Sequence, residues 1–196
     1  MKGLAMLGFY YDSSVCTGCR TCVVACKDKN DLPADVNFRR VTTFETGEYP
    51  NVRMYHLSLA CNHCENPACV RACSSGALFV DDDGTVQFDN DLCIGCESCV
   101  KACPYGEPQI VPELNVMRKC NSCKPLRDAG MNPVCVDACP MRAIEFGDLD
   151  EIRARHEGES LVADLPCLPY STTTAPSLLV HPKDAALEED YKQTIL

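Results

Sequence analysis

The stretch LCIGCESCVKACPYG, residues 92–106, places four thiols close together. The cysteines are Cys93, Cys96, Cys99 and Cys103, spaced as C-x2-C-x2-C-x3-C and followed by Pro104. Thiolates are soft ligands, which suit zinc, copper(I) and iron–sulfur centres better than magnesium or calcium. The number of such groups along the sequence decides between these centres.

Sixteen of the 17 cysteines fall into four groups of four. Groups one and three share the x2-x2-x3 spacing, group two has x2-x4-x3, and group four has x2-x11-x3 with Pro140 behind it. In sequence order the groups are Cys16, Cys19, Cys22, Cys26; Cys61, Cys64, Cys69, Cys73; Cys93, Cys96, Cys99, Cys103; and Cys120, Cys123, Cys135, Cys139. Only Cys167 is left over, and we interpret it as a free thiol.

Two kinds of centre use four thiolates, namely structural zinc and iron–sulfur clusters. Group four alone fits a zinc ribbon, in which a longer loop separates the cysteine pairs. Groups one and three instead have the spacing of two-cluster ferredoxins, where the fourth cysteine binds the neighbouring cluster. We therefore predict iron–sulfur clusters, with a zinc-stabilised structural protein as the alternative.

The rest of the composition excludes several classes of protein. The formal charge of −10 argues against nucleic acid as a partner, because such binding needs a clustered basic surface. The start, MKGLAMLGFYYDSS, has no A-x-A-like cleavage site, and Arg39-Arg40 is internal, so we expect no export signal. The sequence contains no run of 18 apolar residues, so we expect no membrane-spanning helix. No G-x-G-x-x-G follows a strand, so we expect no flavin or nicotinamide site.

The segments between the cysteines predict short strands and helices. We expect strands at 5–11, at two places within 38–60 around a turn at Gly47 and Pro50, at 78–89 as a hairpin turning at Asp83-Gly84, and near 109–111 and 144–146. Short helices should follow 19–26, 96–103 and 135–139, and a helix capped by Asp148, with Glu151 behind it and Gly158 at its end, should lie within 147–160. The acidic run at 81–83 is expected to be a solvated hairpin tip rather than a cation site.

These elements indicate an α+β fold, with duplicated ferredoxin-like modules of two [4Fe–4S] clusters each, in one domain over residues 1–160. The tail, 161–196, has four prolines and no clear periodicity, so we expect that it does not bury itself. It is then either disordered or, as we favour from its recurring aliphatic residues, laid extended across a partner. The groups can pair as one with two and three with four, or nested, as one with four and two with three. Spacing alone leaves both pairings open.

The span from 5 to about 155 resembles the four-cluster ferredoxin subunit of the dimethyl sulfoxide reductase family of molybdopterin oxidoreductases. The likeness is carried by DSSVCTGCRTCVVACKDKNDL, FRR, CNHCENPACVRAC, SGAL, DLCIGCESCVKACPYG, KCNSC, CVDACP and RAIEFGDLDE. The resemblance implies nested pairing and four [4Fe–4S] clusters. Their implied ligands are Cys16, Cys19, Cys22, Cys139 (cluster 1); Cys26, Cys120, Cys123, Cys135 (cluster 2); Cys61, Cys64, Cys69, Cys103 (cluster 3); and Cys73, Cys93, Cys96, Cys99 (cluster 4).

The resemblance also implies a function and partners. The protein would carry single electrons between a quinol-oxidising membrane anchor and a catalytic subunit with a molybdenum (or tungsten) bis-pterin, and would not itself be an enzyme. It would be held through its partners at the membrane, at the outer face of the cytoplasmic membrane, although a cytoplasmic complex is equally compatible with the sequence. A ferredoxin-like subunit of a hydrogenase or formate dehydrogenase is the alternative assembly.

Several polar residues lie beside the predicted ligands. His63 sits inside a C-x2-C pair, and we expect it to hydrogen-bond a cluster or the backbone rather than to catalyse. The basic neighbours of the ligands are Arg20, Lys27, Arg71, Lys101, Lys119 and Lys124. We expect each of them to be a solvated side chain, the alternative being a cation that raises a cluster potential.

Overall fold

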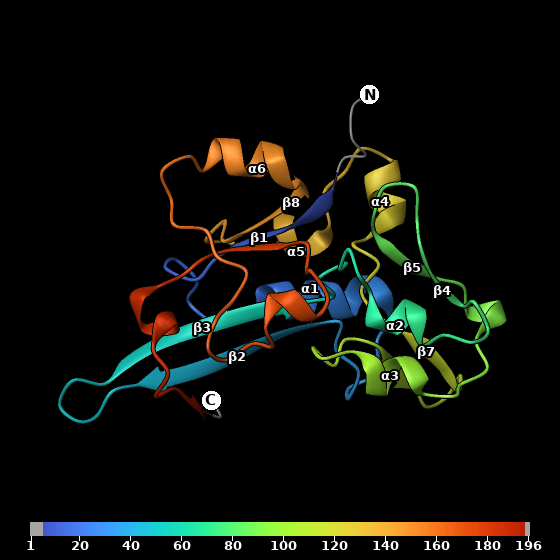
Figure 1. The fold of residues 1–196 in the computed structure, drawn as a ribbon, viewed down its shortest axis with the longest axis horizontal. Coiled ribbons are helices and arrows are strands. Elements are labelled where there is room, and N and C mark those ends of the chain that lie inside the picture. Colours follow the sequence, from blue (N-terminus) through green and yellow to red (C-terminus); the bar gives the residue numbers. More distant parts are fainter. Residues whose placement is uncertain (1–5, 195–196) are drawn as a thin grey trace.

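A computed structural model describes residues 6–194 of the protein, which fold into short elements around clusters of buried side chains (Figure 1). The strands are β1 (Leu7–Asp12), β2 (Arg39–Thr46), β3 (Arg53–Ala60), β4 (Leu78–Val80), β5 (Val86–Phe88), β6 (Gln109–Val111), β7 (Val116–Arg118), β8 (Ile144–Asp148), β9 (Leu178–His181) and β10 (Lys192–Thr194). The α-helices are α1 (Thr21–Asn30), α2 (Ala68–Arg71), α3 (Ser98–Ala102), α4 (Lys124–Asp128), α5 (Val134–Asp137) and α6 (Leu149–Arg155). Short 3-10 turns lie at Asn90–Leu92, Ser171–Thr173 and Asp184–Leu187. The mixture of short helices and strands confirms the predicted α+β class.

One sheet has the order β8-β1-β9 and is covered by α6 on one face (Figure 1). Strand β1 pairs antiparallel with β8 and parallel with β9. Because side chains alternate along a strand, Tyr10 of β1 packs with Ile152 beneath α6, whereas its neighbours Phe9 and Tyr11 join the main core. The sheet thus joins segments from both ends of the sequence and separates α6 from the cysteine groups.

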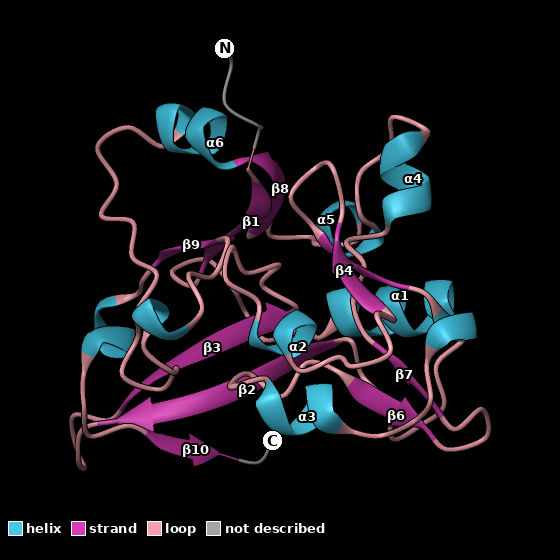
Figure 2. Ribbon diagram, turned by 45° about the vertical axis from the view of Figure 1, so that its right-hand side comes forward, coloured by secondary structure: helices cyan, strands magenta, loops and turns pink. Residues whose placement is uncertain are grey.

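The second sheet, β10-β2-β3, is built on a long hairpin that runs along the lower edge of the molecule (Figure 2). Its register runs from Arg39 opposite Ala60 to Thr46 opposite Arg53, and Gly47 then turns the backbone at φ +76°. The hairpins β4-β5 and β6-β7 are smaller, and Gly84 (φ +79°) lies in the turn of the first. The predicted turns at Gly47 and Gly84 are therefore confirmed.

The predicted helices are present with different bounds. Helix α1 is longer than expected and itself carries Cys22 and Cys26, one turn apart. Helix α6 starts as predicted, because the Asp148 carboxylate accepts the backbone N–H of Asp150 and Glu151, but it ends at Arg155. Among the residues described, no helix is both long and apolar enough to cross a membrane.

The tail does not behave as its sequence suggests. The expectation that it would not bury itself is wrong for residues 161–194, since β9 pairs with β1, β10 pairs with β2, and Leu178, Leu179 and Val180 are buried. A strand that is buried on both faces has a continuous apolar run instead of an alternating pattern, so its periodicity gives no signal. The tail therefore packs on the preceding residues, and residue 160 does not separate two independently packed parts.

A network of charged side chains ties α6 to the sheet beneath it. The ring of His156 stacks on Tyr10 with centroids 4.0 Å apart, and its nitrogens lie 2.7 Å from Glu145 Oε1 and 2.9 Å from Glu159 Oε1. Partial burial lowers the pKa of His156, but hydrogen bonds to Glu159 and Glu145 outweigh it, so the pKa is raised overall. Arg155 pairs with Glu145, and His181 lies 3.3 Å from Glu159.

We predict that Leu179→Ala lowers the free energy of unfolding by about 2–5 kcal/mol, the usual range for truncating a buried leucine. Leu179 is 2% exposed and packs beneath α6, so the lost methyl groups leave a cavity. Anaerobic denaturant titration measures the change. Leu187→Ala, in the same tail but 50% exposed, is the matched control. Equal effects of the two substitutions would contradict the packing of the tail on β1.

We predict that His156→Gln destabilises the protein below about pH 6.5 and loses this effect as the pH rises. The raised pKa means that the imidazolium is stabilised in the folded protein. Its contribution is therefore complete below the unfolded pKa and disappears as the pH passes the folded pKa. Anaerobic melting curves of both proteins from pH 5.5 to 8.5 test this, and a difference in melting temperature that does not change with pH would refute it.

Candidate functional site

The four cysteine groups share one backbone feature. The residue just before the second cysteine of each group has a positive φ, at Gly18 (+69°), His63 (+44°), Gly95 (+67°) and Ser122 (+52°). In groups one and three the residue after that cysteine is also left-handed, at Arg20 (+61°) and Glu97 (+60°). Such left-handed residues curl the backbone and can turn successive N–H groups toward one centre, the type of concavity in which proteins bind iron–sulfur clusters. At two of the four positions glycine adopts the conformation without strain.

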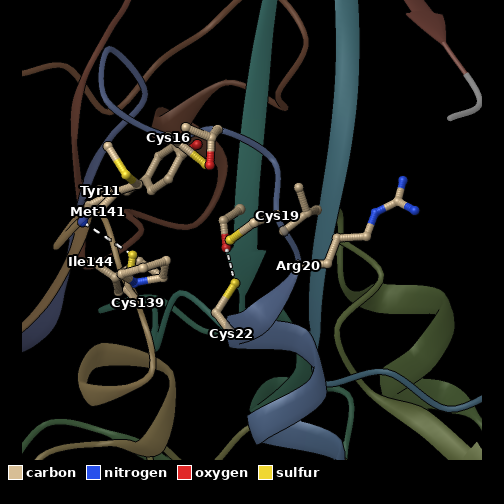
Figure 3. Close-up of a pocket in the computed structure, with 13 residues that line it drawn as sticks. Tyr11, Cys16, Cys19, Arg20, Cys22, Cys139, Met141 and Ile144 are labelled. Carbon is tan, nitrogen blue, oxygen red and sulfur yellow. Dashed lines mark hydrogen bonds between the residues drawn. The ribbon is translucent and has the colours of Figure 1, made fainter.

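The first set of four thiols lines a pocket that is partly open to solvent (Figure 3). Cys16 and Cys19 come from the loop before α1 and Cys22 from α1 itself, whereas Cys139 follows α5 and belongs to group four. Tyr11 and Ile144, from neighbouring strands, complete the apolar wall. The structure thus brings three cysteines of group one together with the last cysteine of the final group.

A second pocket has the same construction. Cys93, Cys96 and Cys99 of group three line it together with Cys73, the fourth cysteine of group two. Apolar side chains close it, among them Ile94 and Met117.

The other two sets lie mostly in the interior, with Cys64 and Cys103 partly buried. Burial raises the pKa of Cys26 to about 12, and the negative charges of Cys135 and Cys123 add to the rise. The pKa of Cys120 is raised in the same way by burial and by the charges of Cys26, Cys61 and Cys135. Helix α1, which carries Cys26, packs against α5, which carries Cys135, and both thiols lie with Cys120 in the main cluster of buried side chains.

The remaining interior set joins groups two and three. Burial raises the pKa of Cys69 to about 12, and the charges of Cys61, Cys103 and Cys64 contribute, while Lys119 opposes them. Burial likewise raises the pKa of Cys64 to about 11. Thiols with such pKa values are neutral at pH 7 unless a metal holds them as thiolates, as bound iron does. The two interior donor sets therefore fit a cationic metal core.

The four sets are arranged in a row. The negative charge of Cys135 in the second set contributes to the raised pKa of Cys22 in the first. In the same way, Cys61 of the third set contributes to the raised pKa of Cys120 in the second. Cys69 of the third set and Cys73 of the fourth are one helical turn apart at α2. The row is exposed at both ends and buried in its middle. The exposed thiols are Cys19 and Cys96, and the buried ones in the middle include Cys26, Cys61, Cys120 and Cys135.

Backbone amides point at several of these sulfurs. The N–H groups of Met117, Ser122 and Ala143 lie 3.3 Å from the sulfurs of Cys93, Cys120 and Cys139, respectively. Hydrogen bonds to ligand sulfurs are one of the means by which proteins set cluster potentials. Among residues 6–194, no three His, Cys, Asp or Glu side chains converge tightly enough to hold a single metal ion.

The interior between the second and third sets is polar. His63 is fully buried, its Nδ1 accepts the N–H of Val86 at 3.0 Å, and burial holds its pKa well below the usual range. The predicted hydrogen bond to the backbone is therefore confirmed. Lys119 was expected to be solvated and is instead fully buried, with Nζ donating to the carbonyls of Val86 and Cys120. Solvation of Lys119 was thus a wrong prediction, since the two carbonyls take the place of water.

Two further buried charges were missed by sequence reasoning. Glu107 is 1% exposed, and burial raises its pKa to about 7 although it pairs with Arg40 at 2.6 Å. Arg39 is 2% exposed and forms no carboxylate pair among the described residues. The only signal of a buried arginine in the sequence was the FRR motif. Its two arginines have the same chemistry, but they lie on opposite sides of β2, and only Arg39 is buried.

The acidic run at 81–83 is not simply solvated. Asp81 lies 3.0 Å from Lys124 and Asp83 lies 2.9 Å from Arg127, so α4 neutralises the hairpin tip. Hydrogen bonds from Thr85 and Arg127 overcome the effect of burial and lower the pKa of Asp83 to about 2. These carboxylates hold α4 against the β4-β5 hairpin.

Comparison with known proteins agrees with this donor set. Residues 52–149 match the 4Fe-4S dicluster domain and residues 13–30 match a 4Fe-4S binding domain. The protein is 44% identical over 183 residues to the B subunit of anaerobic dimethyl sulfoxide reductase of Escherichia coli (strain K12), covering 89% of its own length and 88% of the relative. It is 41% identical over 188 residues to the same subunit of Haemophilus influenzae, covering 91% and 90%. It is 42% identical over 146 residues to the thiosulfate reductase electron transfer subunit of Salmonella typhi, covering 72% and 75%.

We predict that Gly95→Ala lowers both the iron content of the protein and its melting temperature more than Gly76→Ala does. Both glycines have a positive φ, which costs an alanine about 1–2 kcal/mol. A Cβ at Gly95 would also lie 2.6 Å from the Asn115 carbonyl oxygen, whereas at Gly76 it would meet nothing within 4 Å. Iron analysis and anaerobic melting of both variants measure the difference, and equal losses would show that the loop of group three is not constrained by this contact.

Proposed function

Because the protein belongs to the family of iron–sulfur subunits that includes the B subunit of anaerobic dimethyl sulfoxide reductase, we propose that it relays single electrons through four [4Fe–4S] clusters between two partner subunits of a respiratory oxidoreductase. The observation that carries the proposal is the row of four thiol sets, exposed at both ends and buried in between. When bound, a cluster of this type accepts and returns one electron.

We assign the ligands to the clusters in the nested way. Cluster 1 would be held by Cys16, Cys19, Cys22 and Cys139, and cluster 4 by Cys73, Cys93, Cys96 and Cys99; the two pockets lined by these sets support the assignment. Clusters 2 and 3 would take Cys26, Cys120, Cys123, Cys135 and Cys61, Cys64, Cys69, Cys103, supported by their mutual charge effects. The repeated left-handed positions in groups one and three support a duplicated pair of ferredoxin-like modules.

The residues of the protein have distinct roles in this relay. The thiols fix the clusters, backbone N–H groups such as that of Ala143 donate to ligand sulfurs, and buried side chains keep water from the middle of the row. The four thiolate ligands leave a cluster no position for substrate, so catalysis would lie in a partner. Exclusion of water keeps the charges of neighbouring clusters strongly coupled.

The two ends of the row are suited to partners. Met141 is an exposed large apolar side chain that lines the pocket with Cys19, and Ile94, which lines the pocket with Cys96, is 66% exposed. One end would face a catalytic subunit with a molybdenum or tungsten bis-pterin, and the other a membrane anchor that oxidises a quinol to a quinone. The quinol would release two protons and two electrons, and the electrons would pass one at a time to the catalytic subunit. The complex would be held at the membrane through the anchor, which we place at its outer face.

We predict that the complex, isolated anaerobically through a tag on this subunit, contains roughly sixteen irons from this subunit, further iron from a partner, and about one molybdenum or tungsten. Iron and molybdenum analysis of the purified complex measures this. Iron without molybdenum or tungsten would instead indicate a hydrogenase-like partner. Zinc in place of iron would overturn the relay.

The nested ligand assignment has its own test. Cys139→Ser should lower the iron content and alter the electron paramagnetic resonance signal of one cluster, because it removes a ligand from a set otherwise made by group one. Cys167→Ser, which changes the one cysteine outside the four groups, should leave the iron content unchanged. A changed signal from the cluster of Cys93, Cys96 and Cys99, with the cluster of Cys16, Cys19 and Cys22 unchanged, would contradict the assignment.

A further inference from the structure

Arg39 is a buried cation that the protein only partly satisfies. It stands at the start of β2, 2% exposed, with its guanidinium carbon 4.8 Å from the centroid of the Phe9 ring. Nη1 donates to the carbonyl oxygen of Ser58 at 3.3 Å and to its hydroxyl at 3.1 Å. Nε and Nη2 have no hydrogen-bond partner among the described residues. A buried charge in this state is strongly unfavourable unless an opposite charge lies nearby.

The negative charges that act most strongly on Arg39 are those of thiolates from two different sets. Burial alone would lower the pKa of Arg39, yet it is raised, because the charges of Cys135, Cys22, Cys120 and Cys26 outweigh the burial. In return, Arg39 lowers the pKa of each of Cys22, Cys26 and Cys120 against the effect of burial. Cys22 belongs to the first set and the other three to the second, so Arg39 lies between them.

A direct path also joins Arg39 to one ligand. The hydroxyl of Ser58 is 3.1 Å from Nη1 of Arg39 and 3.5 Å from the sulfur of Cys22, a contact drawn as a dashed line in Figure 3. Ser58 is 2% exposed, so water does not compete for this hydroxyl. The guanidinium therefore polarises the hydroxyl that faces the sulfur.

We propose that Arg39 is the counter-cation shared by clusters 1 and 2 and that it raises the reduction potentials of both. The inference rests on the cluster assignment proposed above. A cluster with four thiolate ligands is anionic and gains a further negative charge with each electron, so a cation fixed between two clusters stabilises the reduced state of both. Because the guanidinium remains charged at all physiological pH values, this contribution does not depend on protonation.

The next residue shows that not every arginine of this strand has that role. Arg40 points to the other side of β2, its side chain is 36% exposed, and Glu107 neutralises it at 2.6 Å. Arg39 forms no ion pair with a carboxylate within residues 6–194, although its charge reaches Glu107 and lowers the pKa of that carboxyl less than Arg40 does. A purely structural arginine in the same place would hold β2 to β3 through Ser58 without affecting a potential.

The experiment compares four variants of the anaerobically purified complex by redox titration followed with electron paramagnetic resonance. Arg39→Gln removes the charge, Arg39→Lys keeps it, and Ser58→Ala removes only the hydroxyl between Arg39 and Cys22. Arg153→Gln, at an exposed position on α6, is the matched control for loss of an arginine. Iron content and anaerobic melting temperature are measured for each, because a structural role would change these without changing a potential.

We expect Arg39→Gln to make two of the four midpoint potentials more negative and to leave the other two unchanged. At a fixed potential the ratio of reduced to oxidised cluster should fall at least tenfold for both, which is about 59 mV for one electron. Arg39→Lys and Arg153→Gln should remain near the wild type. Four unchanged midpoints in an Arg39→Gln complex with full iron, or an equal shift in Arg39→Lys, would overturn the proposal.

If the complex with Arg39→Gln does not assemble, the complex with Ser58→Ala tests the proposal in its place. It keeps the cation and should lower one midpoint, that of the cluster bound by Cys22, and four unchanged midpoints would again overturn the proposal. Absence of [4Fe–4S] signals from the wild-type complex would instead overturn the proposed function itself, so the two failures are distinguishable.

Discussion

In the proposed assignment each set of four thiols closes around one centre, although its members come from distant parts of the sequence. Cys139 reaches the pocket of Cys16, Cys19 and Cys22 only because β8 pairs with β1 directly after group four. Likewise, Cys73 reaches the pocket of group three at the end of α2, which contacts α3. The thiols are themselves core residues, since Cys22, Cys26, Cys61, Cys120, Cys135 and Cys139 lie in the main cluster of buried side chains. Burial disfavours the thiolate form of these cysteines, and a bound metal stabilises that form. Folding and metal binding are therefore expected to be coupled.

The same constraint explains the polar interior. A row of anionic clusters would repel one another in a dry medium, where charges interact strongly. The described interior supplies opposite charge at the junctions, with Arg39 between the first two sets and Lys119 beside Cys120 and near Cys61 and Cys69 of the third. Neutral His63 and the paired Glu107 share this region without adding a cation. Buried charges that would be unfavourable in an ordinary core thus become understandable beside metal centres.

The sequence predicted what depends on local spacing and left open what depends on the tertiary fold. The turns at Gly47 and Gly84 and the cap at Asp148 follow from residue types that act over a few positions, and these predictions are confirmed. The burial of Lys119 and Arg39 does not follow from residue type and local spacing. Arg40, for example, has the same side chain as Arg39 beside it, yet it is partly exposed and paired with Glu107. Strand β9 was missed for a related reason, since a continuous run such as Leu178 to Val180 has no period. The pairing of groups is also non-local, and no count of residues between cysteines specifies it.

In the proposed relay the fourth cysteine of each group binds the neighbouring cluster in a nested order. The anomalous scattering of iron in crystals of the anaerobically purified complex would reveal this order. We expect a four-iron peak bounded by Cys16, Cys19, Cys22 and Cys139, and another bounded by Cys73, Cys93, Cys96 and Cys99, with two more in the interior between them. Peaks bounded by groups one and two together, or a single metal ion at any of the four places, would contradict it.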